Sequence, residues 1–207
     1  MSKFEENFQK IVEELEALDK TFVIKGSPKE YEKIWVPNNE IRLWSIPRQS
    51  AEILKSLVLI KQPKLILELG TSAGYSTIWL ASGARHYGGK VYTIELTKPK
   101  IEIAKKYFQK AGVAENIEQL EGKIFDILSN WDKKIDFVFL DADKGNYISY
   151  IKQLEPSLSN NAVIVADNAS DYRDLMKDYL IYVTTSGKYH SYLLNIDHGL
   201  MISVKLS

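Results

Sequence analysis

Hydrophobic residues follow two patterns along the chain, and the change comes at Gln62-Pro63. Before that point, apolar side chains recur at spacings of three and four, which predicts amphipathic helices over residues 4–18 and 46–59. The region 21–45 between them is mixed and contains Pro28 and Pro37, so we expect short helix and loop there.

After residue 63, short apolar runs alternate with longer amphipathic segments. This predicts strands at 65–67, 91–94, 117–120, 135–140 and 162–165, alternating with helices at 75–85, 98–111, 124–131, 146–157 and 171–183. Such alternation is typical of βαβ units, whose parallel sheet is covered by helices on both faces. Residues 189–196 and 200–204 break the rhythm and predict a C-terminal antiparallel hairpin. We therefore expect one doubly wound α/β domain with a mostly parallel seven-stranded sheet, made of a helical extension (1–45) and a core (46–207).

Composition narrows the classes of function. The chain of 207 residues carries 27 Lys and Arg against 27 Asp and Glu, so its formal net charge is zero, which argues against a dedicated nucleic-acid-binding protein. Cysteine is absent, which excludes disulfides, thiolate metal sites and thiol nucleophiles. No stretch has the length and apolarity of a membrane span or a signal segment, so we expect a soluble, cytoplasmic protein with no membrane partner.

The first predicted strand leads into a glycine turn. The segment LELGTSAGYS (67–76) places Gly70 and Gly74 between this strand and the next helix. In an open parallel sheet, ligands bind outside the carboxyl ends of the strands, where glycine permits a tight turn and close backbone approach. Glycines that only pack a helix against a strand give the same pattern. Glu95 ends the second strand, where an acid can accept hydrogen bonds from ribose hydroxyls, although an ordinary exposed acid also fits that place.

The charges at the strand ends indicate which kind of ligand the site favours. Acids stand at the carboxyl ends of several predicted strands, namely Glu68, Glu95, Asp141 and Asp167. Such a set repels a pyrophosphate and favours a metal ion or a cationic ligand. S-adenosylmethionine fits this description, because it carries a sulfonium, an amino group and a ribose but no phosphate, whereas NAD fits it poorly.

Two further strand ends predict a metal site. Asp141 follows one strand and Asp167-Asn168 the next, so two carboxylates and an amide oxygen should meet there. All-oxygen ligation suits Mg²⁺ or another hard divalent cation such as Mn²⁺ or Ca²⁺. Asp and Asn are also common in turns and helix caps, but both motifs on consecutive strands favour the metal. Lys144 is a candidate base for a hydroxyl acidified by that metal, and we expect Asp143 to face solvent or cap a helix.

These residues resemble a known family, the class I S-adenosylmethionine-dependent O-methyltransferases of the catechol and caffeoyl-CoA type, in particular the small bacterial, metal-dependent branch. The matching segments are LELGTSAGYST (67–77), VYTIEL (91–96), FVFLDADKGNY (137–147), VIVADN (163–168) and IDHGLMIS (196–203). The resemblance extends over residues 46–205 and implies a Rossmann-like methyltransferase fold.

The resemblance also implies roles for individual residues. Lys144 corresponds to the family's catalytic lysine, and the metal ligands correspond to Asp141, Asp167 and Asn168. Glu95 would bind the ribose of the cofactor, Ile46 would close over it, and Asp141 would also lie near its amino group. The methionine end would be framed by Glu68, Gly70, Thr71, Ser72, Gly74 and Ser76.

The chain departs from the family pattern in two places. Near the adenine, where the family usually has an acidic and a small residue, this chain has Lys123 and Ile124, so adenine recognition there is doubtful or falls to backbone groups. The segment after Asn168 runs almost directly into the next predicted helix, so we expect an open acceptor site.

Three functions stay open at this point. The first is methyl transfer to a small catechol-like or vicinal-diol acceptor, and the second is O-methylation of a wobble 5-hydroxyuridine in tRNA. The third, a non-catalytic cofactor-binding or dimerisation module, is the least favoured. For tRNA, a basic surface could be built from Lys98, Lys100, Lys105, Lys106, Lys133 and Lys134, which are otherwise solvated helix faces. The resemblance also implies a homodimer, with Tyr31, Trp35 and Trp44 in the core or covering the cofactor mouth or the dimer face.

Overall fold

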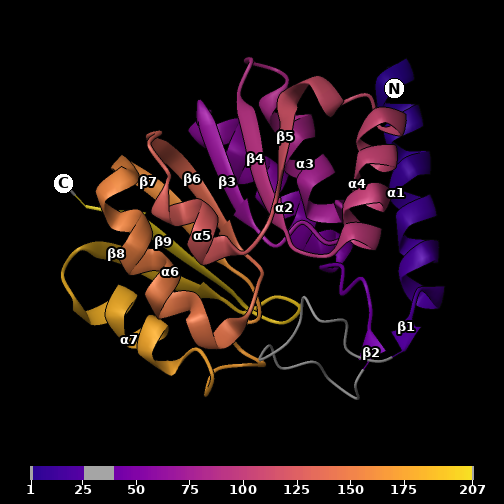
Figure 1. Cartoon of the computed structure of the whole chain (residues 1–207). Coiled ribbons are helices and arrows are strands. Elements are labelled where there is room, and N and C mark those ends of the chain that lie inside the picture. The colour runs from indigo at the N-terminus through magenta and orange to yellow at the C-terminus, as the bar shows by residue number, and fades with distance from the viewer. Residues whose placement is uncertain (1, 26–39, 207) are drawn as a thin grey trace.

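The computed structural model describes residues 2–25 and 40–206, so the interpretation of Tyr31 and Trp35 lies outside the described residues (Figure 1). The N-terminal part comprises α1 (Lys3–Thr21), the short strands β1 (Ile24–Lys25) and β2 (Glu40–Ile41), and α2 (Arg48–Lys61). Helix α1 begins with a capping box, in which Ser2 and Glu5 satisfy each other's backbone N–H groups. In the described part of the chain, no helix combines the length and apolarity needed to cross a membrane.

The core alternates strands and helices as the sequence predicts. Its elements are β3 (Leu65–Leu69), α3 (Tyr75–Ala84), β4 (Lys90–Glu95), α4 (Lys98–Lys110), β5 (Ile117–Glu121), α5 (Ile124–Ser129), β6 (Ile135–Leu140), α6 (Tyr147–Leu154), β7 (Leu158–Ala166), α7 (Lys177–Thr185), β8 (Tyr189–Leu194) and β9 (Leu200–Lys205). Single 3₁₀ turns lie at Ala114–Asn116, Lys144–Asn146 and Glu155–Ser157.

The sheet has seven strands in the order β5-β4-β3-β6-β7-β9-β8. Strands β3 to β7 are parallel, while β9 runs antiparallel to both β7 and β8. The predicted fold, a mostly parallel sheet with a C-terminal antiparallel hairpin, is therefore confirmed. The strand order reverses between β3 and β6, so the carboxyl ends of these two strands flank the position where such sheets bind ligands.

Helices cover both faces of the sheet (Figure 1). On one face, α1 to α4 pack against inward side chains such as Ile66 and Phe137. On the other face, α5 to α7 cover their neighbours in the strands, such as Leu67 and Val138. Because adjacent residues of a strand point to opposite faces, the continuous apolar runs that identified these strands are explained by burial on both sides.

The last helix begins later than predicted. The sequence predicts a helix over 171–183, whereas α7 starts at Lys177, after a series of turns. The reason is that the segment after Asn168 is bound to the hairpin: the amides of Ser170 and Asp171 donate to the carbonyl of His198, and that of Ala169 donates to Gly199. The carboxyl end of β7 is thus fixed by the turn between β8 and β9.

Candidate functional site

The turn after β3 has a backbone that favours glycine at two positions. Gly70 and Gly74 have φ angles of +103° and +85°. A Cβ on Gly70 would lie 2.2 Å from the backbone oxygen of Asp141, so no side chain fits there without moving the end of β6. Gly74 is the N-cap of α3, and a Cβ on it would meet the ring of Phe108. The glycines therefore bring the turn against β6, in agreement with the close approach inferred from the sequence.

Glu68 lies beneath this turn and is buried. One carboxylate oxygen accepts a hydrogen bond from the hydroxyl of Ser76, and the other accepts from the hydroxyls of Thr77 and Thr93. Thr71 joins the same group through a 2.6 Å contact between its hydroxyl and that of Thr93. Burial raises the pKa of Glu68 to about 7, in spite of the three hydroxyl donors that lower it. In this arrangement Glu68 and Ser76 hold the turn to the sheet from below.

The raised pKa makes stability depend on pH. The folded state binds a proton on Glu68 up to about pH 7, whereas an ordinary glutamate releases it near 4.5, so its contribution to stability decreases as the pH rises between these values. Relative to Glu68→Gln, wild type should therefore lose about 2–3 kcal/mol of unfolding free energy between pH 5 and pH 8. Urea denaturation of both proteins at several pH values measures this difference. A difference that stays constant with pH would contradict the assignment.

Glu95, at the end of β4, lies beside the opening of the turn. Its carboxylate accepts hydrogen bonds from the amides of Ser72 (2.8 Å), Leu96 and Thr97 (both 2.9 Å). The Ser72 hydroxyl in turn donates to the carbonyl of Leu43. Ile46, three residues further on, is buried in the apolar cluster that α2 and α3 share. The structure thus brings the predicted ribose acid, the turn and the segment before α2 together.

Asp141 and Asp167, two of the three predicted metal ligands, directly follow the paired residues Leu140 and Ala166 at the ends of β6 and β7. The Nζ of Lys144 lies 2.6 Å from Oδ1 of Asp141, and the two side chains are 15% and 16% exposed. Asp167 is 3% exposed, and its buried Oδ1 accepts no hydrogen bond from any described residue. Burial, followed by the charge of Asp141, raises the pKa of Asp167. Asp143 caps the 3₁₀ turn Lys144–Asn146, as expected, by accepting from the amide of Gly145.

The predicted donors are the carboxylates of Asp141 and Asp167 and the amide of Asn168, which follows Asp167 in the chain. Across residues 2–25 and 40–206, no group of three His, Cys, Asp or Glu side chains is placed to hold a metal. A buried carboxylate oxygen without a donor, next to a second carboxylate, is a site that a cation would stabilise. The residues present therefore fit a hard cation with open coordination positions.

Of the six non-glycine residues with positive φ in the described part of the chain, four lie in segments at this edge of the sheet, while Gln62 and Asn161 lie elsewhere. Non-glycine residues with positive φ include Trp44 (52°), Ser72 (48°), Asn168 (65°) and Asp197 (49°). Such conformations cost free energy and persist where the surrounding structure enforces them. Asp197, for example, accepts hydrogen bonds from the amide (3.1 Å) and the hydroxyl (2.6 Å) of Ser50 in α2. The hairpin turn therefore joins the start of α2 to the end of β7.

The sequence did not predict the positions of some residues near the site. Lys100, assigned there to a basic surface, is instead 2% exposed, with Nζ 4.4 Å from the ring centre of Trp44. Because Lys100 is buried, the six lysines do not form one exposed patch. His198 pairs with Asp171 at 2.6 Å, a contact between the hairpin and the segment after β7 that spacing could not reveal.

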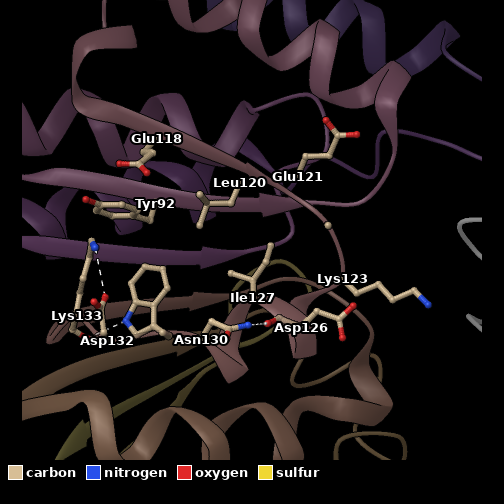
Figure 2. Close-up of a pocket in the computed structure, with 12 residues that line it drawn as sticks. Tyr92, Glu118, Leu120, Glu121, Lys123, Asp126, Ile127, Asn130, Asp132 and Lys133 are labelled. Atoms are coloured by element: carbon tan, nitrogen blue, oxygen red, sulfur yellow. Dashed lines mark hydrogen bonds and ion pairs between the residues drawn. The ribbon is translucent and has the colours of Figure 1, made fainter.

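A groove of about 520 Å³ adjoins the predicted adenine position, between β5 and α5 (Figure 2). Lys123 and Gly122 form one end of it, and Gly122 has a φ of +148° with its amide bound to the carbonyl of Glu95. Ile124 begins α5 at once after Lys123. The charged side chains lining the groove are Glu118, Glu121, Lys123, Asp126, Asp132 and Lys133. Acids therefore predominate along it.

Comparison with known proteins agrees with this geometry. A sequence model described as O-methyltransferase matches residues 29–175. Catechol O-methyltransferase from Mycobacterium tuberculosis is 38% identical over 125 residues, which cover 60% of this chain and 56% of that protein. Caffeoyl-CoA O-methyltransferase from Zinnia elegans is 34% identical over 134 residues, covering 60% and 54%. The chain thus spans a little over half the length of these curated relatives.

Solved structures show the same fold. Cofactor-bound Rv0187 from MTB superposes with a TM-score of 0.72 at 30% identity, covering 78% of this chain and 82% of the other. The O-methyltransferase TomG from Streptomyces achromogenes, solved in complex with SAM, has a TM-score of 0.72 at 22% identity and full coverage of both chains (100%), a likeness that concerns the fold alone. Because the family's sequence model matches most of the chain, the protein belongs to the O-methyltransferase family.

Proposed function

We propose that the chain transfers a methyl group from S-adenosylmethionine to a hydroxyl of a small catechol-like or vicinal-diol acceptor, with the help of a divalent metal ion. The observation that carries this proposal is the Oδ1 atom of Asp167, which is buried and accepts no hydrogen bond from a described residue. It lies beside Asp141, because the two residues follow adjacent strands, at the edge of the sheet where the glycine turn also lies. The relative named catechol O-methyltransferase supports the acceptor class. The complex of TomG with SAM, on the same fold, supports the donor.

The cofactor would lie along the carboxyl ends of β3 and β4. Glu95 would accept hydrogen bonds from the ribose, since a carboxylate offers about four lone-pair sites and three amides occupy part of them. Gly70 to Gly74 would frame the methionine end and Ile46 would cover it, while Glu68 and Ser76 would support the turn from below. The adenine would lie against Gly122, Lys123 and Ile124, where backbone groups are available. The acids of the crevice suit the positive sulfonium.

The metal would be held by Asp141, Asp167 and Asn168, with Mg²⁺ as the first candidate and Mn²⁺ or Ca²⁺ as alternatives. When bound, such an ion supplies a Lewis acid that lowers the pKa of an acceptor hydroxyl and fixes its oxygen. Lys144 lies beside Asp141, so its amine, once deprotonated, is placed to take the proton that the hydroxyl gives up.

A charge-matched pair of variants tests the role of Lys144. If Lys144 accepts the proton, both Lys144→Ala and Lys144→Arg should lower turnover by roughly a hundredfold to ten-thousandfold, because an arginine keeps the charge but cannot serve as a base. The loss should shrink at higher pH and with more acidic phenols, whose hydroxyls ionise without help. Recovery of turnover in Lys144→Arg would show that only the positive charge is needed.

An acceptor comparison tests the function as a whole. With S-adenosylmethionine labelled in the methyl group and Mg²⁺ present, we expect label to appear in catechol and not in bulk tRNA. The acids lining the groove beside the adenine position favour this outcome, because they repel the phosphates of RNA. Labelling of tRNA alone would contradict the small-molecule acceptor and favour a wobble uridine as the acceptor. Binding of the donor without transfer to any hydroxyl would contradict an enzymatic role.

A further inference from the structure

Lys100 is a buried cation that the proposed chemistry does not use. It lies in the first turn of α4, two residues after Lys98, which is exposed. Its side chain is 2% exposed, and its Nζ lies 4.4 Å from the ring centre of Trp44. Lysine is almost never fully buried unless it is paired. Among residues 2–25 and 40–206, Lys100 makes no salt bridge. A functional role for the positive charge of Lys100 would explain its buried position.

The charges around Lys100 place it beside the cofactor crevice. Burial lowers the pKa of Lys100, and the negative charges of Glu95, Asp141 and Asp19 oppose that shift and favour the ammonium. Glu95 lies at the proposed ribose end of the cofactor, and Asp141 lies near the proposed amino end. The sulfonium lies between those two ends of the molecule. The ammonium of Lys100 therefore acts on the part of the crevice where the cofactor's own charge is located.

We infer that Lys100 makes the crevice discriminate by charge between S-adenosylmethionine and its product, and that it favours the neutral product. The inference rests on the proposed function. In the transfer, the bond from sulfur to methyl breaks and a bond from the acceptor oxygen to methyl forms, while the hydroxyl proton leaves to a base. The sulfonium becomes an uncharged thioether, so a neighbouring cation destabilises the donor and not the product.

The size of this effect follows from Coulomb's law. Two unit charges about 8 Å apart at an effective dielectric constant of about 20 repel enough to change an equilibrium roughly thirtyfold. Because Lys100 is buried, salt screens the repulsion only weakly. A repulsion that disappears during the reaction raises the free energy of the bound donor and so promotes transfer. The accompanying cost is that the product binds more tightly than the donor and so competes with it.

Calorimetric titration of S-adenosylmethionine and S-adenosylhomocysteine tests the inference without measuring turnover. In Lys100→Met, the affinity for the donor relative to the product should rise by roughly five- to thirtyfold over wild type. Lys100→Arg, which keeps the charge, should leave the ratio close to that of wild type. Lys98→Met removes the same charge from an exposed position of the same helix turn and should also leave the ratio unchanged.

The outcomes separate this inference from the proposed function. Equal changes in both affinities, or none, would overturn the inference, because a packing or hydrogen-bonding role cannot distinguish the two ligands by charge. Failure of wild type to bind either ligand would overturn the proposed function, and the inference with it. We expect Lys100→Met to fold, because methionine is apolar and fills a similar volume, and Lys100→Gln, with its melting temperature recorded, provides a second neutral variant.

Discussion

Gly70→Ala is expected to lower the affinity for S-adenosylmethionine by roughly a hundredfold or more. The added Cβ would lie 2.2 Å from the backbone oxygen of Asp141, and no side-chain rotation can relieve a clash with the backbone. The turn or the end of β6 has to move, and overpacking of this kind costs about 1–3 kcal/mol in addition to the strain of a positive φ. Both segments belong to the proposed cofactor site. Calorimetry with the purified variant measures the loss.

Gly88→Ala is the matched control. Gly88 also has a positive φ, +79°, but a Cβ there would meet nothing within 4 Å. It should therefore lower stability by about 1–2 kcal/mol through backbone strain and leave cofactor affinity unchanged. If Gly70→Ala binds as tightly as wild type, or if Gly88→Ala weakens binding to the same extent, the turn after β3 is not the binding element.

The local pattern of the sequence was sufficient to predict the strands of the sheet and the acidic residues that lie at its edge. Strands such as β6 are buried on both faces, so their apolar runs are continuous and easily recognised. In parallel strands the carboxyl ends share one edge, and this rule alone brings Asp141 and Asp167 together before any side chain is placed. The same rule placed Glu95 next to the glycine turn.

Contacts between distant segments could not be predicted in this way. Ser50 and Asp197 are 147 residues apart, and nothing in either local sequence indicates that they meet. Lys100 lies among other lysines in a polar segment, and only the direction of α4 from the end of β4 buries it. The late start of α7 has a similar origin, because the hairpin binds the amides that follow Asn168. In each case the deciding interaction is tertiary and leaves no periodic signal.

Asp167→Ala is expected to abolish metal-dependent methyl transfer while leaving the protein folded. The substitution removes one proposed ligand, and metal assistance is worth several kcal/mol, so we expect a rate loss of roughly a thousandfold. The variant should be as stable as wild type in metal-free buffer or more stable, because it loses a buried carboxylate oxygen without a donor. Asp143→Ala is the control, since this neighbouring acid accepts hydrogen bonds from Gly145 and Asn146 of the 3₁₀ turn, is not a proposed ligand and should not affect the rate.

The most direct test of metal-assisted methyl transfer at this edge of the sheet is the initial rate of labelled methyl transfer to catechol. It should be measured for wild type and Asp167→Ala, with a chelator and after Mg²⁺ is restored. We expect wild type to lose its rate in chelator and regain it with Mg²⁺. Asp167→Ala should stay inactive in both conditions although it binds S-adenosylmethionine with an affinity close to that of wild type. Transfer by Asp167→Ala in chelator at the rate of Mg²⁺-restored wild type would contradict the account.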